Sequence, residues 1–410
     1  MSPRRPFLGR MKSLPSNRCR PQLRCRPRCG QSSSQTCTKN LINVPYIRHM
    51  GHKAPYQLPP LPPATEKIQT IATLKKATTA TFAIAELKGI AETIPSQQML
   101  VNAITLKEAK DSSEIENIIT STDELYEALA TKDSAVKPQT KEVVNYRRSI
   151  MLGFDILKDQ GFIRVNDIVN IQKDLLNNDA GIRSTPGTVL KNDATGEVVY
   201  TPPQDKIEIE SLLSNFIKYY NDNTLRDGVP DLIWLAVLHF QFESIHPFYD
   251  GNGRTGRILN ILFLIMNGMI DIPILYLSSH IIQNKPEYYR LLNQVNKTGE
   301  WEEWILFMLD AVERTAIATK RQILAIRSQL KEKIQLIKTR LPKIYSRELV
   351  ELIFEQPYSK IEYVVDKLGV ERKAASRYLR QLEEIGVLTS KRVGRETIYI
   401  NVDLFTLLKK

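Results

Sequence analysis

Apolar side chains recur three and four positions apart along most of this 410-residue chain, which is the spacing of amphipathic helices. The pattern runs from Glu66 to about Ala130 and resumes from residue 143 to residue 310. It is broken at residues 182–203, where two short runs of β-forming residues flank a stretch that contains proline, glycine and aspartate. The sequence therefore predicts a mainly α protein with one β-hairpin in its central part.

The last part of the chain has a different pattern. Residues 311–344 are rich in Lys, Gln and Ile and predict a helical linker. Residues 345–410 then show three helical segments followed by two short strands. Three helices and a two-stranded ribbon are the elements of a winged helix-turn-helix, so we expect a separate C-terminal domain.

Positive charge is concentrated near the N-terminus. The chain has 57 Lys and Arg against 45 Asp and Glu, but ten of the basic residues and no acidic residue fall within residues 1–40. The remainder is nearly neutral, so the net charge of +12 does not by itself indicate nucleic-acid binding. The acid-free leader predicts a disordered basic tail over residues 1–49. A transit peptide and a start misread upstream of Met50 are the alternatives.

Cysteine usage and hydropathy exclude several classes of protein. Cys19, Cys25, Cys29 and Cys37 all lie in the same tail, and their spacing lacks the paired arms of a common zinc site. The rest of the chain has no cysteine from which to build a disulfide framework. No apolar stretch reaches the roughly 18 residues that a membrane span needs. We therefore expect a cytoplasmic protein without a membrane partner.

The most informative segment is residues 246–257, His-Pro-Phe-Tyr-Asp-Gly-Asn-Gly-Arg-Thr-Gly-Arg. An apolar helix precedes it and a second helix begins within it, so its glycines and backbone N–H groups can form an anion-binding loop. Arg254 and Arg257 add fork-shaped contacts for phosphate oxygens, and Asp250 is an oxygen ligand of the kind that Mg²⁺ accepts. His246 can remove a proton from a hydroxyl group near neutral pH. The segment predicts chemistry at a phosphoryl centre.

Two other phosphate-binding patterns are disfavoured. Gly251, Gly253 and Gly256 formally match the dinucleotide fingerprint G-x-G-x-x-G, but that fingerprint follows a strand, and here a helical apolar face precedes it. A Walker A loop would end in Gly-Lys-Ser or Gly-Lys-Thr, which this segment lacks.

Residues 246–257 resemble the complete motif of the Fic family, HPFx(D/E)GNGRxxR, at every fixed position. The resemblance extends from a proline-rich segment near Tyr56 to about Asp310. It implies a Fic N-terminal helical domain at residues 50–140 and a Fic catalytic domain at residues 141–310, in which residues 182–203 form a flap. It also implies a protein adenylyltransferase that moves AMP from ATP to a Ser, Thr or Tyr hydroxyl. The intact glycine loop favours AMP transfer over Doc-type phosphotransfer.

The resemblance implies a role for each matching residue. His246 would be the base, Asp250 would hold Mg²⁺, and a target protein would dock its backbone on the flap. The residues implied to bind ATP come from the loop, the flap and a later helix: Gly251, Asn252, Gly253, Arg254, Thr255, Gly256, Arg257, Val189, Leu190, Tyr288 and Asn296. Removal of AMP by the same site, and a homodimer, remain open.

A shorter pattern lies upstream. Ser112, Glu116 and Asn117 fit the family's inhibitory pattern, (S/T)xxxE(G/N). This implies a class II Fic protein, in which an N-terminal inhibitory helix pairs Glu116 with Arg257 and occupies the cation that the γ-phosphate of ATP requires. A Ser before Glu is also a helix N-cap, which is the structural alternative.

Basic residues follow the third helix and the wing of the C-terminal domain: Arg372, Lys373, Arg377, Arg380, Lys391, Arg392 and Arg395. They predict DNA binding through phosphate contacts, with protein docking as the alternative because Glu residues are interspersed. For the whole chain, the alternative to an autoinhibited enzyme is a DNA-binding regulator whose Fic fold senses nucleotide. His239, on an apolar helix face, is expected to be a core histidine.

Overall fold

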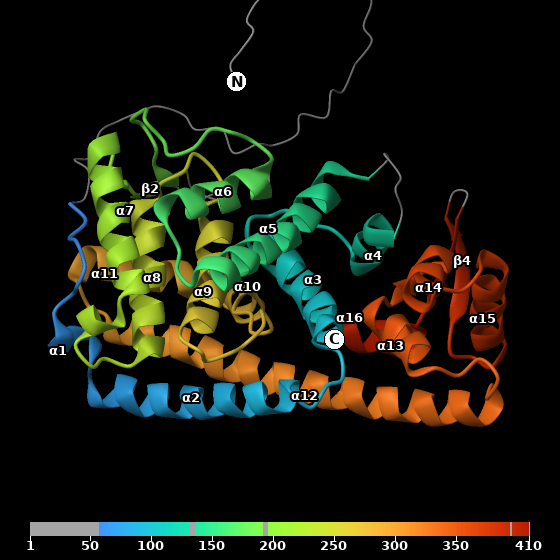
Figure 1. The fold of residues 1–410 in the computed structure, drawn as a ribbon. Helices are drawn as coiled ribbons and strands as arrows, with labels where there is room; N and C mark the ends of the chain where they lie inside the picture. Colours follow the sequence, from blue (N-terminus) through green and yellow to red (C-terminus); the bar gives the residue numbers. More distant parts are fainter. Residues whose placement is uncertain (1–56, 131–135, 192–195, 394–395, 410) are drawn as a thin grey trace, which may run out of the picture. The chain divides into compact units, whose positions relative to one another are not determined.

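The computed structural model describes residues 57–130, 136–191, 196–393 and 396–409. All described residues belong to one compact unit. The predicted basic tail and its four cysteines therefore lie outside the described residues. The described part is mainly helical (Figure 1), as the apolar spacing predicts.

Four helices form the N-terminal part: α1 (Thr65–Ile68), α2 (Ile71–Ala91), α3 (Gln97–Ile115) and α4 (Thr122–Ala130). The start of α2 is capped by Thr70, whose hydroxyl accepts a hydrogen bond from the backbone N–H of Thr73 at 3.2 Å. One side of α2 buries a row of alanines. These small side chains allow the helix to pack closely along α12 (Glu302–Arg340), as Figure 1 shows.

The helix α12 is continuous over 39 residues. It begins at Glu302, well before the predicted linker, because Trp304, Ile305 and Met308 continue its buried face and no Gly or Pro interrupts it. The predicted linker at residues 311–344 is thus largely part of a helix that packs on α2.

Two buried helices, α8 (Asp231–Ile245) and α9 (Asn252–Met266), pack against each other at the centre of the fold. Both are apolar on almost every side, so burial within the protein is where such helices are stable. The remaining elements of the central part are α5 (Pro138–Gln160), α6 (Val165–Leu176), α7 (Lys206–Asn221), the short 3₁₀ helix η1 (Asn223–Arg226), α10 (Ser278–Gln283) and α11 (Lys285–Thr298).

The predicted hairpin is confirmed. Strands β1 (Leu190–Lys191) and β2 (Val198–Tyr200) pair antiparallel, with Leu190 opposite Tyr200. The hydroxyl of Tyr200 donates to the backbone carbonyl of Ser244 in α8 at 2.8 Å. The base of the flap is therefore fixed to the helix that leads into the motif.

The C-terminal part contains the predicted helices and ribbon together with two elements that the sequence pattern did not reveal. Its elements are α13 (Arg347–Glu355), β3 (Tyr358–Ser359), α14 (Ile361–Leu368), α15 (Arg372–Glu384), β4 (Thr389–Val393), β5 (Glu396–Ile400) and α16 (Val402–Lys409). The three strands form one sheet in the order β3-β5-β4. The two unforeseen elements are β3, which is only two residues long, and α16.

This C-terminal part packs on the N-terminal helices. The ring of Tyr358 stacks on that of Tyr126 in α4, with centroids 5.2 Å apart, and its hydroxyl donates to Asp123 at 3.0 Å. At the start of α3, the Ser96 hydroxyl donates to the Glu355 carboxylate at 2.6 Å. The helix that precedes Glu116 is thus held by C-terminal residues as well as by the central helices.

Candidate active site

His246 and the glycine loop connect the two central helices. Helix α8 ends at Ile245 and is followed by His246, whose backbone is left-handed (φ 48°), and Gly251 (φ 80°) directly precedes α9. A left-handed residue other than glycine is strained and needs support from its surroundings. Part of that support comes from Phe242, whose carbonyl accepts the His246 N–H at 3.0 Å.

The other support is Arg183, a buried arginine at the start of the flap. Its Nε donates to the carbonyl of His246 at 2.7 Å, and its Nη2 donates to the carbonyl of Ile245 at 3.3 Å. Burial lowers the pKa of Arg183 to about 10. The side chain therefore remains charged at neutral pH and fixes the backbone on which His246 sits.

The imidazole of His246 is kept in its neutral form. Burial, and then the positive charge of Arg183, lower its pKa to about 4, although the Glu243 backbone and the Glu116 charge act in the opposite direction. Its Nδ1 atom is buried. A neutral imidazole at physiological pH can accept a proton, which is what a general base must do.

The loop between His246 and α9 is braced by its own side chains. The amide of Asn252 accepts the Phe248 N–H and donates to the Phe248 carbonyl, both at 2.8 Å. Asp250 accepts the N–H of Gly251 at 2.6 Å, yet its side chain is 66% exposed. The Asn252 side chain thus shapes the loop, and the Asp250 carboxylate remains accessible at its edge.

The two arginines of the motif are both buried, each beside a carboxylate. Arg254 donates from Nη1 to Glu142 of α5 at 2.5 Å, and its Nη2 lies 3.8 Å from Asp250. The Nε of Arg254 is buried without a hydrogen-bond partner among the described residues. Arg254 therefore retains an unused donor beside the glycine loop.

Arg257 makes three contacts with α3 and the residue that ends it. Its Nε donates to the Ser112 hydroxyl at 2.7 Å, and its Nη2 donates to the Ser112 carbonyl and to Glu116 Oε1, both at 2.9 Å. The pairing of Glu116 with Arg257 that the resemblance implies is therefore present. Asn117 follows in a left-handed conformation (φ 63°), and its side-chain oxygen accepts from Lys285 of α11 at 3.4 Å.

The Glu116 carboxylate lies directly against the glycine loop. A Cβ atom on Gly253 would come within 2.4 Å of Glu116 Oε1 and 2.9 Å of Arg257 Nη1. Burial on its own would raise the pKa of Glu116, but the charge and hydrogen bond of Arg257 outweigh it and lower the pKa. Glu116 is thus an anion seated against the loop predicted to bind phosphate.

A second carboxyl group, Glu243, lies one turn before His246. Its Oε1 atom is buried without a hydrogen-bond partner in the described part of the chain, and a Cβ atom on Gly256 would come within 2.5 Å of it. Burial raises the pKa of Glu243 to about 8, despite the nearby positive charge of Arg257. The absence of a side chain at Gly256 leaves room for a carboxyl group that is protonated at neutral pH.

The other residues predicted to bind ATP lie on α11 and on the flap. Tyr288 is buried, and its hydroxyl makes a hydrogen bond with His239 Nε2 at 2.9 Å. Asn296 lies beside Ser244 of α8, with 3.5 Å between Asn296 Oδ1 and the hydroxyl oxygen. Val189 and Leu190 are half-buried in and beside β1. These contacts put α11 next to the helix that carries His246.

Two more residues for which the sequence made a prediction, His239 and Thr255, lie on the central helices α8 and α9. His239 is a core histidine, as expected: burial lowers its pKa to about 3, and its ring stacks on Trp304. Thr255 is fully buried, and its hydroxyl has no hydrogen-bond partner among the described residues.

The flap is joined to the motif by backbone contacts. Ile182 forms a β-bridge with Phe248, and the phenolic oxygen of Tyr249 accepts the N–H groups of Ser184 at 2.9 Å and Thr185 at 3.2 Å.

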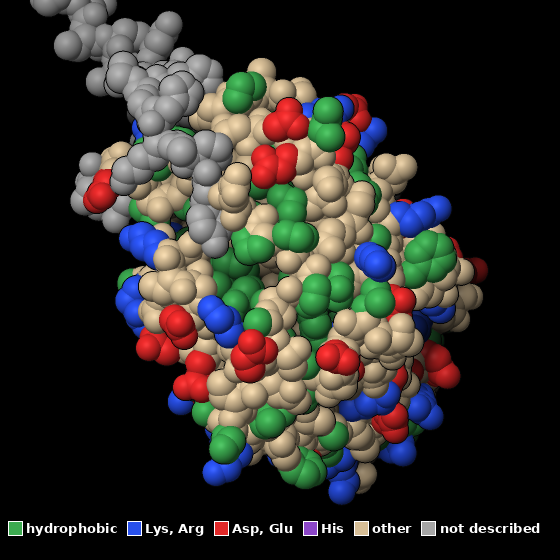
Figure 2. Space-filling view, turned by 90° about the vertical axis from the view of Figure 1, so that its left-hand side faces the viewer, with side chains coloured by type: hydrophobic (Ala, Val, Ile, Leu, Met, Phe, Trp, Pro, Cys, Tyr) green, Lys and Arg blue, Asp and Glu red, His purple; other side chains and the backbone are tan. Residues whose placement is uncertain are grey.

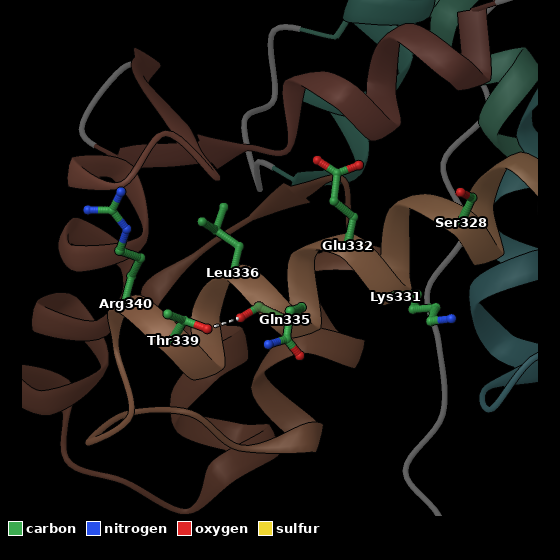
Figure 3. A pocket seen from close by; sticks show the side chains of 7 residues that line it. All are labelled: Ser328, Lys331, Glu332, Gln335, Leu336, Thr339 and Arg340. Carbon is green, nitrogen blue, oxygen red and sulfur yellow. Dashed lines mark hydrogen bonds between the residues drawn. The ribbon is translucent and has the colours of Figure 1, made fainter.

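Figure 2 views the side on which α7 and α11 lie in Figure 1 and shows hydrophobic side chains gathered in the middle of that face. A hollow of about 530 Å³ along α12 includes no predicted site residue (Figure 3).

Within the described part of the chain, no group of three or more His, Cys, Asp or Glu residues could hold a metal ion by itself. None of the described helices is long and apolar enough to cross a membrane.

Three residues of the site were not predicted from the sequence: Arg183, Glu142 and Glu243. Each is far from the motif in sequence or lies in a helix that reads as simple core. The one available signal was chemical: Glu243 is an acidic residue within the apolar helix α8.

Three family models match successive parts of the chain. They are described as Fic/DOC family N-terminal (residues 74–155), Fic/DOC family (residues 162–264), and Protein adenylyltransferase SoFic-like, C-terminal domain (residues 330–404). The second of these includes the flap and the loop that carries His246.

Two named relatives are similar to parts of this chain. The protein adenylyltransferase Fic of Nematostella vectensis is 38% identical over 80 residues, which is 20% of this chain and 17% of that protein. The protein adenylyltransferase Fic of Aedes aegypti is 26% identical over 160 residues, or 39% of this chain and 30% of that protein. The matched segments thus span less than a third of either relative.

A crystal structure of a Fic family protein from Desulfovibrio desulfuricans G20 has the same fold. It superimposes with a TM-score of 0.52 over 83% of this chain and 98% of that chain, at 18% sequence identity.

Proposed function

Because this chain belongs to the Fic/DOC family, we propose that it is a protein adenylyltransferase that moves AMP from ATP to a Ser, Thr or Tyr hydroxyl of a target protein. The observation that carries the proposal is a neutral His246 next to a glycine loop with two buried arginines. A base, an anion-binding loop and fixed cations are the groups that nucleotidyl transfer requires.

In the proposed reaction the target hydroxyl gives its proton to the His246 imidazole. The hydroxyl oxygen then forms a bond to the α-phosphorus of ATP while the bond between the α-phosphorus and the bridging oxygen breaks. Pyrophosphate leaves, and AMP remains on the protein. Arg183 contributes by holding the His246 backbone through a 2.7 Å hydrogen bond, since a base acts only at the right position.

Arg254 and Arg257 would contact the phosphates. The free Nε donor of Arg254 and the N-terminus of α9 support this role, because both present N–H groups to the loop. The accessible carboxylate of Asp250 fits a Mg²⁺ ion that takes its remaining ligands from phosphate and water. Such an ion would neutralise charge on the departing pyrophosphate.

We also propose that Glu116 inhibits the enzyme. It already occupies Nη2 of Arg257 at 2.9 Å, and its carboxylate lies against Gly253. An anion at this place competes with the γ-phosphate for the same cation. A triphosphate that cannot reach Arg257 would bind with its α-phosphorus displaced from the attacking hydroxyl, and a displacement of about 1 Å can cost roughly a hundredfold in rate.

Target proteins would dock on the flap. The β1–β2 hairpin lies next to the motif, and Val199 of β2 is 38% exposed. A strand from the target could add to this hairpin through its backbone, which would leave the side chains of the target free to vary.

The proposal is tested by intact mass spectrometry of the Glu116→Gly protein after incubation with ATP and Mg²⁺. We expect the protein to gain the mass of one AMP group, and the gain to disappear in the Glu116→Gly/His246→Ala protein. A gain of one phosphate group would indicate phosphotransfer instead. Binding of ATP without any covalent product would favour a nucleotide-sensing regulator.

A further inference from the structure

The C-terminal part of the chain presents a basic helix face to solvent. Helix α15 buries Ala375, Leu379 and Leu382 on one side. Its exposed residues include four basic side chains: Arg372, Lys373, Arg377 and Arg380. We propose that this face of α15 binds duplex DNA, whether or not the chain transfers AMP.

The position of α15 in the fold supports this assignment. Helix α14 ends at Leu368 and is followed by Gly369, which is left-handed (φ 64°); α15 starts three residues after Gly369, so the two helices form a helix-turn-helix. The second helix of such a pair enters the major groove, with its N-terminal residues nearest to the base edges. Arg372, Lys373 and Arg377 lie in this N-terminal half.

The other elements of the C-terminal part pack against the remainder of the protein, and α15 lies on the surface. Helices α13 and α16 pack on α3 and α12, and β3 packs on α4, whereas α15 packs mainly on α14. Lys391 of β4 is ion-paired with Glu127 of α4 and so faces the N-terminal helices. The neighbouring Arg392 is exposed.

Among the described residues, none forms an ion pair with the charges on this face. None of the four arginine and lysine side chains of α15 forms an ion pair with a described residue, whereas basic residues of α12 do so with Glu86 and Asp403. Glu383 points to the sheet, where its carboxylate accepts the Ser390 N–H at 2.8 Å. Glu371 and Glu384 are exposed at the two ends of the helix, and the stretch between them presents mainly positive charge.

The chemistry of this face favours duplex DNA over a protein partner or double-stranded RNA. Along the described α15, no large apolar side chain is exposed, whereas protein interfaces are anchored by buried aromatic and aliphatic side chains. Double-stranded RNA has a major groove too deep and narrow for a helix. B-form DNA has a major groove that admits one.

The expected salt dependence follows from the number of charges. We assume that each of the four side chains, Arg372, Lys373, Arg377 and Arg380, neutralises one phosphate. The logarithm of the association constant should then fall linearly with the logarithm of the salt concentration, with a slope of about −3.6, because each contact contributes about −0.9. Removing two of these contacts should bring the slope to about −1.8.

The test is fluorescence anisotropy of a labelled mixed-sequence duplex of about 20 base pairs with the full-length protein, at salt concentrations from about 50 to 200 mM. The Arg377→Ala/Arg380→Ala protein should bind about tenfold more weakly at the lowest salt and show the reduced slope. Arg377→Lys/Arg380→Lys should restore the slope, because the charge is retained.

The matched control is Lys331→Ala/Arg340→Ala, which removes two exposed basic residues from α12 (Figure 3). It should leave affinity and slope unchanged, and so should His246→Ala, which separates DNA binding from AMP transfer. Absence of binding at low salt, an equal loss in both double variants, or equal affinity for double-stranded RNA of the same sequence would each overturn the proposal.

Discussion

Replacing Glu116 with glycine should convert a weakly active protein into an active one. The change removes the carboxylate that Arg257 holds at 2.9 Å and leaves the two hydrogen bonds from Arg257 to Ser112, so the guanidinium keeps its position. The γ-phosphate of ATP can then take the place of the carboxylate.

The size of the effect can be worked from this contact. A hydrogen bond that involves a charged group is worth about 1.5–3 kcal/mol. The Glu116 side chain is 33% exposed, so solvent screening puts the contact at the lower end, about 1.5–2 kcal/mol. Since about 1.4 kcal/mol is a factor of ten, productive ATP binding should improve roughly tenfold to thirtyfold.

Two assays measure this gain. Automodification with α-labelled ATP should be at least about tenfold faster in Glu116→Gly than in wild type, and saturating ATP with Mg²⁺ should raise its melting temperature more. The matched control is Glu114→Gly, which removes a carboxylate two residues away that pairs with Lys110 and not with Arg257. Arg257→Ala should cancel the gain in the double variant. Equal rates in wild type and Glu116→Gly, or equal activation by Glu114→Gly, would refute the reasoning.

Three further changes test neighbouring parts of the site. Gly253→Ala should lower labelling in the Glu116→Gly background, because its Cβ would lie 2.9 Å from Nη1 of Arg257, the cation proposed to bind the γ-phosphate. Arg183→Met should lower kcat about tenfold or more while calorimetry finds ATP affinity unchanged, because Arg183 positions His246 and not the nucleotide. The pKa of Glu243 is raised to about 8 by burial, so its stabilising effect is present below about pH 4.5 and is lost as pH rises through 8. Glu243→Gln should therefore show a smaller drop in melting temperature between pH 5 and pH 8; an unchanged drop would contradict this.

The part of the site that lies in one contiguous stretch of the chain could be predicted from the sequence. Residues 246–257 predict the loop, the two arginines beside it and the start of α9 because a helix terminus and its glycines are local features. The pairing of Glu116 with Arg257 spans 141 residues, and it was reached only through the resemblance to a known family.

The rest depends on tertiary packing. Glu142 reaches Arg254 from a helix 112 residues away, and Arg183 reaches His246 across 63 residues. Neither the periodicity of apolar residues nor a turn motif in the sequence indicates contacts between residues so far apart along the chain. The strand β3 was missed for a different reason, since two residues cannot show an alternating pattern and Tyr358 and Ser359 become a strand only by pairing with β5.

The most direct test of AMP transfer compares two isotopic forms of ATP in the Glu116→Gly background. With label on the α-phosphate, protein should become labelled in the presence of Mg²⁺, and with label on the γ-phosphate it should not, because pyrophosphate leaves. The His246→Ala change should remove the α-label while ATP binding persists. Labelling from the γ-phosphate, or α-labelling that survives His246→Ala, would contradict the account.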